Sequence, residues 1–177
     1  PQCTVTVWQG DATDPAILAE TEGFFVYGHP KIAGSLMDRM PNLRVISNFG
    51  VGVDHIHLGD AKTRGIAVGN TPRLVDGATA DLTFALLMAV ARNLIIGDRY
   101  ARSAEFTVYD PNLLHGYEVH GATIGIVGMG NIGQQVARRA RGFDMTVLYH
   151  NRKRNEAAEA ELGATYLPLD DLLQQAD

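Results

Sequence analysis

A glycine-rich turn in the second half of the chain has the spacing of a dinucleotide-binding loop. Gly128, Gly130 and Gly133 form the pattern G-x-G-x-x-G, which follows the apolar run 123–127 and precedes an amphipathic stretch. In such a unit the first glycine permits the turn, the second lets the backbone approach a pyrophosphate, and the third lets helix and strand pack closely. The sequence therefore predicts a dinucleotide at a helix N-terminus. The alternative is a tight turn without a ligand.

The residues after the next apolar run, 145–149, bear on the kind of dinucleotide. NAD sites place an acidic residue here to accept hydrogen bonds from the ribose hydroxyls. This sequence has His150, followed by Arg152, Lys153 and Arg154. Because guanidinium groups bind phosphate through two parallel hydrogen bonds, these cations suit the 2′-phosphate of NADP. We expect NADP(H) as the cofactor, with NAD(H) less suited; the alternative is a solvated basic loop.

A second glycine-rich loop, residues 48–54, follows an apolar run in the first half of the chain. Its sequence NFGVGVD places Gly50 and Gly52 two residues apart. Glycines at this spacing free backbone N–H groups to form a concave anion site, which suits a carboxylate. The alternative is an ordinary glycine turn.

Both loops must be positioned by the elements around them, and short apolar runs alternate with helix-forming stretches along both halves of the chain. This pattern predicts an α/β fold with parallel sheets covered on both faces. The expected strands span residues 4–8, 23–27, 43–47, 66–68, 123–127 and 145–149. The expected helices begin at Asp14-Pro15 and then span 32–40, 58–64, 76–92, 132–141, 156–162 and 169–176. Helix 76–92 is apolar nearly all round, so we expect it to be buried.

The strand–helix pattern restarts at Gly121, so the chain holds parts of two doubly wound domains. Residues 1–94 are expected to form most of a substrate domain, and residues 95–177 the start of a nucleotide domain, both incomplete in this chain. Residues 93–120 have weak periodicity and are interpreted as a linker and an arm that joins two copies of the chain. The alternative is that the arm packs on its own domain. Its apolar residues are Leu94, Ile95, Ile96, Phe106, Leu113 and Leu114.

The composition argues against several classes of partner and site. The chain has 177 residues with 15 Lys and Arg and 20 Asp and Glu, and the net charge of −5 argues against nucleic acid and anionic membranes. The most apolar run, 84–91, is far shorter than the about 20 residues of a membrane span. One cysteine, Cys3, excludes an internal disulfide and is typical of a reducing compartment, so we expect a cytoplasmic protein. We expect no metal site.

Four segments together resemble one family. NFGVGVDHI, GIAVGNTPRLVDGATAD, GATIGIVGMGNIG and VLYHNRKR occur in this order in the D-2-hydroxyacid dehydrogenases, and the chain is most similar to the glyoxylate/hydroxypyruvate reductase branch. The resemblance implies a flavodoxin-like substrate domain and a Rossmann nucleotide domain, with the active site in the cleft. It implies reduction of a small 2-oxo acid to the D-2-hydroxy acid by hydride transfer from nicotinamide, and a homodimer formed through the nucleotide domain and the arm.

The resemblance also implies roles for individual residues. The backbone N–H groups of Val51 and Gly52 would hold the substrate carboxylate, and Thr79 would lie near the nicotinamide end of the cofactor. The remaining cofactor contacts fall in two groups. Gly130, Asn131 and Ile132 would contact the pyrophosphate, and Arg152, Lys153 and Arg154 would bind the 2′-phosphate.

The family's catalytic residues are not among these. An Arg that binds the carboxylate, an acid and a proton-donating His are all expected downstream of residue 177. The six histidines of this chain lie outside that motif: His29, His55, His57, His115, His120 and His150. We therefore expect an N-terminal part of an NADPH-dependent 2-oxo acid reductase that is inactive alone. Two alternatives stay open, a non-catalytic nucleotide-sensing module of the same fold and an NAD-linked dehydrogenase for another hydroxy acid.

Overall fold

The computed structural model describes residues 3–177. Its contacts divide the chain into two compact units, a first unit that ends at Leu74 and a second unit, Val75–Asp177. The predicted division into a substrate domain and a nucleotide domain at 94/95 concerns function and stays a prediction. The compact units differ from it in one element, because helix α4 (Asp76–Ala91) belongs by its contacts to the second unit.

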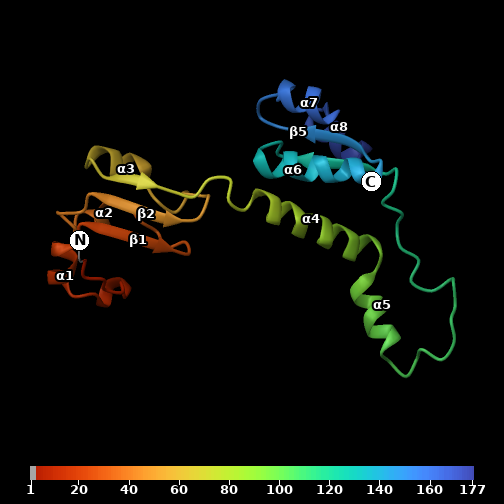
Figure 1. The fold of residues 1–177 in the computed structure, drawn as a ribbon, viewed down its shortest axis with the longest axis horizontal. Coiled ribbons are helices and arrows are strands. Elements are labelled where there is room, and N and C mark those ends of the chain that lie inside the picture. Colours follow the sequence, from red (N-terminus) through yellow and green to blue (C-terminus); the bar gives the residue numbers. More distant parts are fainter. Residues whose placement is uncertain (1–2) are drawn as a thin grey trace. The chain divides into compact units, whose positions relative to one another are not determined.

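The first unit is built on a parallel three-stranded sheet, β1 (Gly23–Tyr27), β2 (Val45–Phe49) and β3 (Ala67–Gly69), in the order β1-β2-β3 (Figure 1). Helix α2 (Gly34–Met37) connects β1 to β2, and α3 (Leu58–Thr63) connects β2 to β3. A short 3-10 helix (Gly10–Ala12) and α1 (Pro15–Glu20) precede the sheet. As the sequence predicts, Asp14 caps α1 by accepting a hydrogen bond from the Ala16 N–H at 2.9 Å.

The sheet of the first unit buries one of its two faces within the described residues. Side chains of neighbouring strand positions point to opposite faces, and Phe24, Val26 and Ile46 are buried, whereas Phe25 and Phe49 are exposed. Both crossovers step in the same direction across the sheet, so α2 and α3 cover the same face. The prediction of a sheet covered on both faces is therefore wrong for the described part of this unit.

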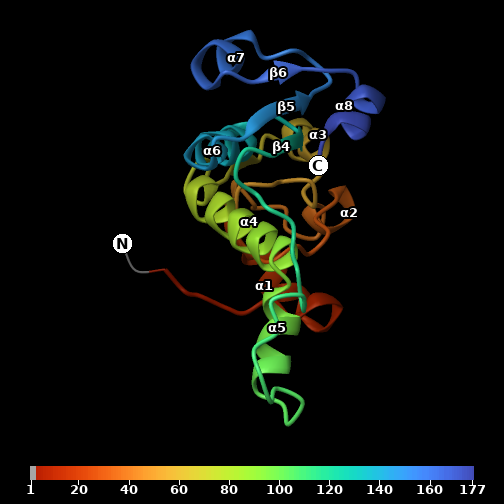
Figure 2. The same ribbon diagram turned by 90° about the vertical axis from the view of Figure 1, so that its right-hand side faces the viewer.

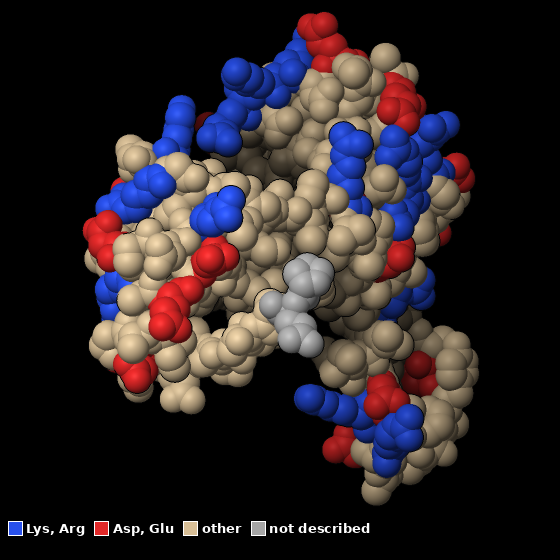
Figure 3. Space-filling view, turned by 60° about the vertical axis from the view of Figure 1, so that its left-hand side comes forward, with Lys and Arg blue, Asp and Glu red and all other residues tan. Residues whose placement is uncertain are grey.

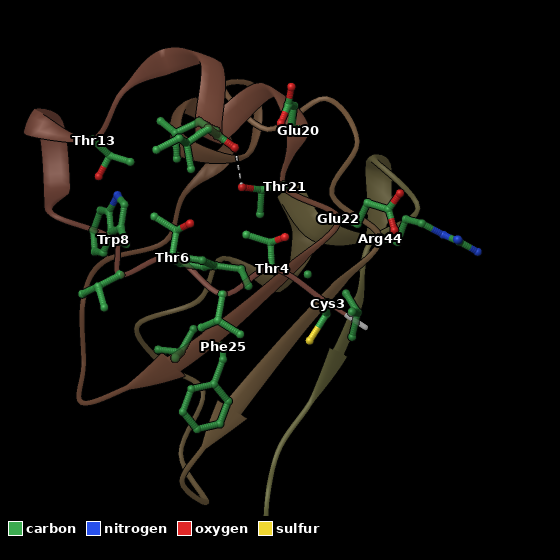
Figure 4. A pocket seen from close by; sticks show the side chains of 18 of the residues that line it. Cys3, Thr4, Thr6, Trp8, Thr13, Glu20, Thr21, Glu22, Phe25 and Arg44 are labelled. Atoms are coloured by element: carbon green, nitrogen blue, oxygen red, sulfur yellow. Dashed lines mark hydrogen bonds between the residues drawn. The ribbon is translucent and has the colours of Figure 1, made fainter. Parts of the chain in front are cut away.

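Two further predictions for the first unit are wrong. Residues 4–8 form no strand, because their backbone joins no ladder. A cavity of about 1360 Å³ lies between this extended segment and β1 (Figure 4). The helix predicted over 32–40 shrinks to α2, since Ile32 instead pairs with Ile56 in an isolated parallel bridge.

The second unit holds the parallel sheet β4 (Thr123–Val127), β5 (Thr146–His150) and β6 (Thr165–Tyr166), in the order β4-β5-β6. Helices α6 (Asn131–Ala140) and α7 (Glu156–Leu162) connect the strands, a 3-10 helix (Arg141–Phe143) follows α6, and α8 (Leu169–Gln175) follows β6 (Figure 2). Ile126 packs toward α4 and α6, whereas a Cβ at Gly125 would meet the Ala176 Cβ at 2.7 Å beside α8. This sheet is thus covered on both faces, as predicted.

Helix α4 lies alongside α6 and is less buried than its composition predicts (Figures 1 and 2). Ala80 and Phe84 are buried, and Phe84 stacks on Phe143 with ring centroids 5.3 Å apart. Leu86 and Val90 are 58% and 78% exposed because only one stripe of the helix faces α6. The apolar composition extends around the whole helix, so composition alone overstates its burial.

Residues 93–120 contain a helix that the sequence interpretation missed, α5 (Leu94–Ala101). Residues 102–120 are mostly turns and extended backbone, and Gly116 packs against the end of α4, with the Tyr117 N–H donating to the Ala91 carbonyl at 2.7 Å. Among the described residues no single helix is long and apolar enough to cross a membrane. Helices α4 and α5 reach that length and composition only as a pair bent by 58°. The α/β fold class with two parallel sheets is confirmed.

Candidate functional site

The turn between β4 and α6 has the backbone that the G-x-G-x-x-G pattern predicts. Gly128 has a φ of +111°, and its N–H donates to the His150 carbonyl at 2.9 Å. A Cβ on Gly133 would lie 2.0 Å from the Gly128 carbonyl oxygen, so the third glycine is required by close packing. At Gly130 a Cβ would meet nothing within 4 Å, which leaves that side of the turn open.

The open side of the turn fits a pyrophosphate. Gly130 is the N-cap of α6, and the first backbone hydrogen bond of the helix runs from the Gln134 N–H to the Gly130 carbonyl at 3.0 Å. The N–H groups of the preceding first-turn residues, among them Asn131 and Ile132, therefore lie at the helix end that carries partial positive charge. The described residues here fit the phosphates of a dinucleotide.

Two asparagines, neither of which was predicted, join this turn to the loop after β5. The Met129 N–H donates to Asn151 Oδ1 at 3.0 Å, and Asn155 Nδ2 donates to the Met129 carbonyl at 3.2 Å. Asn155 Oδ1 also accepts from the Ala158 N–H at 3.1 Å as the N-cap of α7. The two loops that would contact opposite parts of one dinucleotide are thus held by shared hydrogen bonds. Asparagine before a helix signals the cap but not the bond to Met129.

The position expected for an acid in NAD sites holds His150, whose ring is turned toward β6. Its Nδ1 lies 2.9 Å from the Leu167 carbonyl, so this nitrogen carries the proton, and the ring stacks on Tyr166. Arg152 and Lys153 are exposed in the loop, and neither has an ion-pair partner among residues 3–177.

Arg154 differs from its two neighbours because it is already paired. Its guanidinium donates to both carboxylate oxygens of Glu159 on α7, at 2.8 and 2.7 Å. The same carboxylate accepts the Tyr149 hydroxyl at 2.6 Å. These hydrogen bonds, the one from Arg154 first, lower the pKa of Glu159 to about 2, and the carboxylate in turn raises the pKa of Arg154. The pKa of Tyr149 is raised by its burial and by the bond to Glu159.

Thr79, predicted near the nicotinamide end of the cofactor, is half-buried on α4 within the same unit. Its surroundings are fixed by Arg139 of α6, which donates to Asp81 Oδ1 at 2.7 Å and to the Gly77 carbonyl at 3.1 Å. Asp81 is thus structural, as its place in an early helical turn suggests, and it acts through an ion pair between α4 and α6.

In the first unit, the loop after β2 is organised around Asn48, which is 2% exposed. Its Nδ2 donates to the Gly50 carbonyl at 3.1 Å and to the Gly52 carbonyl at 2.9 Å. Its Oδ1 lies 3.0 Å from Nε2 of His55, and His29 packs edge-on against that imidazole at 5.0 Å. The sequence interpretation placed Asn48 in this loop but gave no role in it to the side chains of Asn48, His55 or His29.

Residues after β3 fix the rest of the loop. Asn70 Nδ2 donates to the Val51 carbonyl at 2.8 Å, and the Thr71 N–H donates to the Gly50 carbonyl at 3.0 Å. The carbonyls of three successive loop residues are thereby engaged within the first unit. His57, in contrast, is the N-cap of α3 and accepts a hydrogen bond from the Asp60 N–H at 3.1 Å.

The engaged carbonyls fix the direction of the N–H groups. In a trans peptide the C=O of one residue and the N–H of the next point in opposite directions, and no peptide bond among the described residues is cis. The N–H groups of Val51 and Val53 therefore point away from Asn48, and that of Gly52 points away from Asn70. Val51 and Gly52, which were predicted to bind a carboxylate, thus have N–H groups that point away from the side chains that hold the loop, and so does Val53, which sequence reasoning did not name.

Other features of the surface do not point to a further site. The cavity drawn in Figure 4 is lined by Trp8, Phe25, Arg44 and neighbouring residues, and none of residues 48–54 is in its lining. On the face drawn in Figure 3, Lys and Arg side chains are interspersed with Asp and Glu, and most of the area carries neither. No cluster of metal-ligating side chains is found within residues 3–177.

Comparison with known proteins places the chain among dehydrogenases. The sequence model of the D-isomer specific 2-hydroxyacid dehydrogenase, NAD binding domain, matches residues 84–177. A glyoxylate reductase of Pyrococcus horikoshii is 46% identical over 151 residues, which make up 83% of this chain and 45% of the relative. The chain therefore spans about half the length of this curated relative.

Solved structures agree with this placement. A protein of Thermus thermophilus is 42% identical with a TM-score of 0.83, over 92% of this chain and 51% of that one. D-lactate dehydrogenase of Aquifex aeolicus, solved with NAD and lactic acid, is 29% identical with a TM-score of 0.84, over 94% of this chain and 49% of that one. The chain belongs to the D-isomer specific 2-hydroxyacid dehydrogenase family.

Proposed function

We propose that this chain is part of an NADPH-dependent reductase that converts a small 2-oxo acid of the glyoxylate or hydroxypyruvate type to the D-2-hydroxy acid. The observation that carries the proposal is the orientation of the loop after β2. Its carbonyls are bound to Asn48, Asn70 and Thr71, so its N–H groups face away from these residues and suit a carboxylate. Similarity to glyoxylate reductases supports the substrate class.

In this reaction the chain's own residues bind and orient the substrate and the cofactor. The N–H groups of Val51 and Gly52, with that of Val53, hold the substrate carboxylate. The turn at Gly130 and the N-terminus of α6 hold the cofactor pyrophosphate, and Thr79 lies toward the nicotinamide. Bound NADPH supplies the hydride. Fixing both reactants before the chemical step lowers its entropic cost.

The preference for NADPH rests on the end of β5. His150 faces β6, and no carboxylate stands in the position that holds the ribose hydroxyls of NAD. Arg152 and Lys153 are exposed there and suit a 2′-phosphate. Glu159, on the following helix, is already bound to Arg154.

The remaining catalytic groups are expected in the longer protein. Reduction of a carbonyl requires a proton donor, and the family's Arg, acid and His would polarise the carbonyl and supply that proton. None of the six histidines of this chain is proposed for that role. The 177 residues alone are therefore expected to lack turnover.

A steady-state assay tests the proposal. The complete protein, mixed with glyoxylate or hydroxypyruvate and NADPH, should oxidise NADPH at a rate that saturates with the acid, whereas the 177-residue chain should not. Clear turnover by the 177-residue chain would contradict the assignment of catalysis to downstream residues. A complete protein that binds nucleotide but reduces neither acid would instead support the sensing-module alternative.

We also propose that two copies associate through the nucleotide domain and the arm. Leu94, Ile95 and Ile96 on α5 are each 57–59% exposed, which is unusual for three successive apolar residues. Sedimentation of the complete protein should give a dimer, and Ile95→Asp should give a monomer that still binds nucleotide. A monomeric wild type would show instead that this surface has no role in self-association.

A further inference from the structure

Arg154 forms an ion pair, whereas Arg152 and Lys153 have no ion-pair partner among residues 3–177. Arg154 uses two N–H groups, Nε and Nη2, to bind both oxygens of Glu159, at 2.8 and 2.7 Å. This two-point geometry is the one by which a guanidinium binds a carboxylate or a phosphate most strongly. A phosphate that took Arg154 would therefore have to compete with a carboxylate of the same chain.

The Glu159 carboxylate is held in place by a second residue, Tyr149. The Glu159 side chain is 16% exposed, and it accepts the hydroxyl of Tyr149, a fully buried residue of β5. The Tyr149 hydroxyl also accepts the Asn155 N–H at 2.8 Å, so a movement of this hydroxyl would break its bond to the residue that caps α7. With its pKa lowered to about 2, Glu159 is ionised at neutral pH.

An ionised carboxylate paired with the loop after β5 matters for a phosphorylated ribose. Acidic residues in this region of a Rossmann domain favour NAD and repel a 2′-phosphate. Glu159 of α7 contacts the loop after β5 through Arg154, which alone among the described residues forms an ion pair with it. Arg152 and Lys153 are exposed beside this pair.

We propose that Arg154 sets cofactor selectivity indirectly, by neutralising Glu159, while Arg152 and Lys153 bind the 2′-phosphate. Arg154 is then a positioning residue. The negative charge of Glu159 would disfavour NADPH binding if Arg154 were removed. This inference deepens the proposed NADPH-dependent function and rests on it. The test compares nucleotide affinities between variants, so the inference and the proposed function can fail separately.

The test is a double-mutant cycle on the complete protein, with dissociation constants for NADPH and NADH measured by fluorescence titration at low salt. Arg154→Ala should weaken NADPH binding about tenfold and leave NADH binding unchanged, because a bare carboxylate repels the phosphate. Glu159→Gln, which still accepts the Tyr149 hydroxyl, should bind NADPH at least as tightly as wild type. The double variant Arg154→Ala/Glu159→Gln should recover the wild-type NADPH affinity.

Recovery in the double variant distinguishes the two roles of Arg154. If the double variant binds NADPH as weakly as Arg154→Ala, the guanidinium binds the phosphate directly and the inference is wrong. A parallel loss of NADPH and NADH affinity in Arg154→Ala, with a lower thermal midpoint, would assign the pair a structural role only and would also overturn it.

The pair Arg138–Glu161, which joins α6 to α7 within the same unit, provides the matched control. Arg138→Ala, Glu161→Gln and their double variant should leave the ratio of NADPH to NADH affinity unchanged. The ratio of NADPH to NADH affinity in the wild type tests a different claim. A wild type that binds both nucleotides equally contradicts the NADPH preference, whereas only the cycle decides the role of Arg154.

Discussion

Asn155 Nδ2 donates to the Met129 carbonyl at 3.2 Å and so links the loop after β5 to the glycine turn after β4. The same side chain caps α7 through its Oδ1. One residue therefore stabilises a helix and sets the spacing between two loops that would bind one cofactor.

The two roles of Asn155 can be separated by substitution. Asn155→Ala should lower the free energy of unfolding by about 1–2 kcal/mol, because α7 loses its cap, and should weaken nucleotide binding. Asn155→Ser keeps a capping oxygen but lacks the amide donor, so it should keep most of the stability and still bind NADH more weakly. Urea unfolding and NADH titration measure the two effects. Equal NADH affinity in Asn155→Ser and wild type would show that the bond to Met129 does not shape the site.

Two glycines of the turn, Gly130 and Gly133, should differ in what they tolerate. Gly133→Ala forces a Cβ against the Gly128 carbonyl oxygen, 2.0 Å away, and should cost about 1–3 kcal/mol of stability together with nucleotide binding. Gly130→Ala meets nothing within 4 Å, so its unfolding should match wild type while its nucleotide affinity falls. Gly142→Ala, at an open position of the same unit, is the control for both measurements. If Gly130→Ala binds NADPH normally, the pyrophosphate does not approach the turn there.

Asn48 should control the substrate loop without affecting the cofactor. Asn48→Ala releases the Gly50 and Gly52 carbonyls and should destabilise the protein by about 1–3 kcal/mol. The KM for glyoxylate should rise, because the N–H groups of Val51 and Val53 lose their fixed direction, while the dissociation constant for NADPH stays unchanged. Asn42→Ala, which removes an exposed bond to the Ala19 carbonyl, is the control. An unchanged KM in a folded Asn48→Ala protein would remove this loop from the substrate site.

Glu159 should make stability depend on acidity. Its pKa is about 2 in the folded protein against an ordinary value of 4.5, so the ion pair contributes fully above pH 4.5. As pH falls from 4.5 toward 2 the unfolded chain takes up the proton first, and the contribution is lost. The difference in unfolding free energy between wild type and Glu159→Gln should therefore shrink over this interval. A difference that is independent of pH would show that the pairing with Arg154 does not lower the pKa of Glu159.

The sequence predicted the glycine turn well because its chemistry is local. Gly128 and Gly133 are required by a turn and a contact within six residues, and the strand and helix around them have clear apolar patterns. Pairing between separate elements was not predictable in this way. The sequence interpretation named Arg154 as a phosphate ligand, which stays a prediction, but it did not foresee the ion pair with Glu159, which forms only when α7 has formed.

The errors in the fold have the same origin. Residues 4–8 have the β-branched composition of a strand, but a strand requires a partner and these residues join no ladder. Helix α4 was expected to be buried, although burial depends on which neighbours cover it and here α6 covers one stripe. The side-chain hydrogen bonds of Asn48 and Asn70 were missed because an asparagine near the end of a strand has no distinctive spacing.

The most direct test of the proposed function compares the two nucleotides in one assay. The ratio of kcat/KM with NADPH to that with NADH, at saturating glyoxylate, should exceed about tenfold for the complete wild-type protein, as expected from one charge-assisted phosphate contact. In Arg152→Ala/Lys153→Ala the ratio should fall toward one, because kcat/KM with NADPH falls while kcat/KM with NADH stays the same. Equal efficiency with both nucleotides in wild type, or a preference for NADH, would contradict the account.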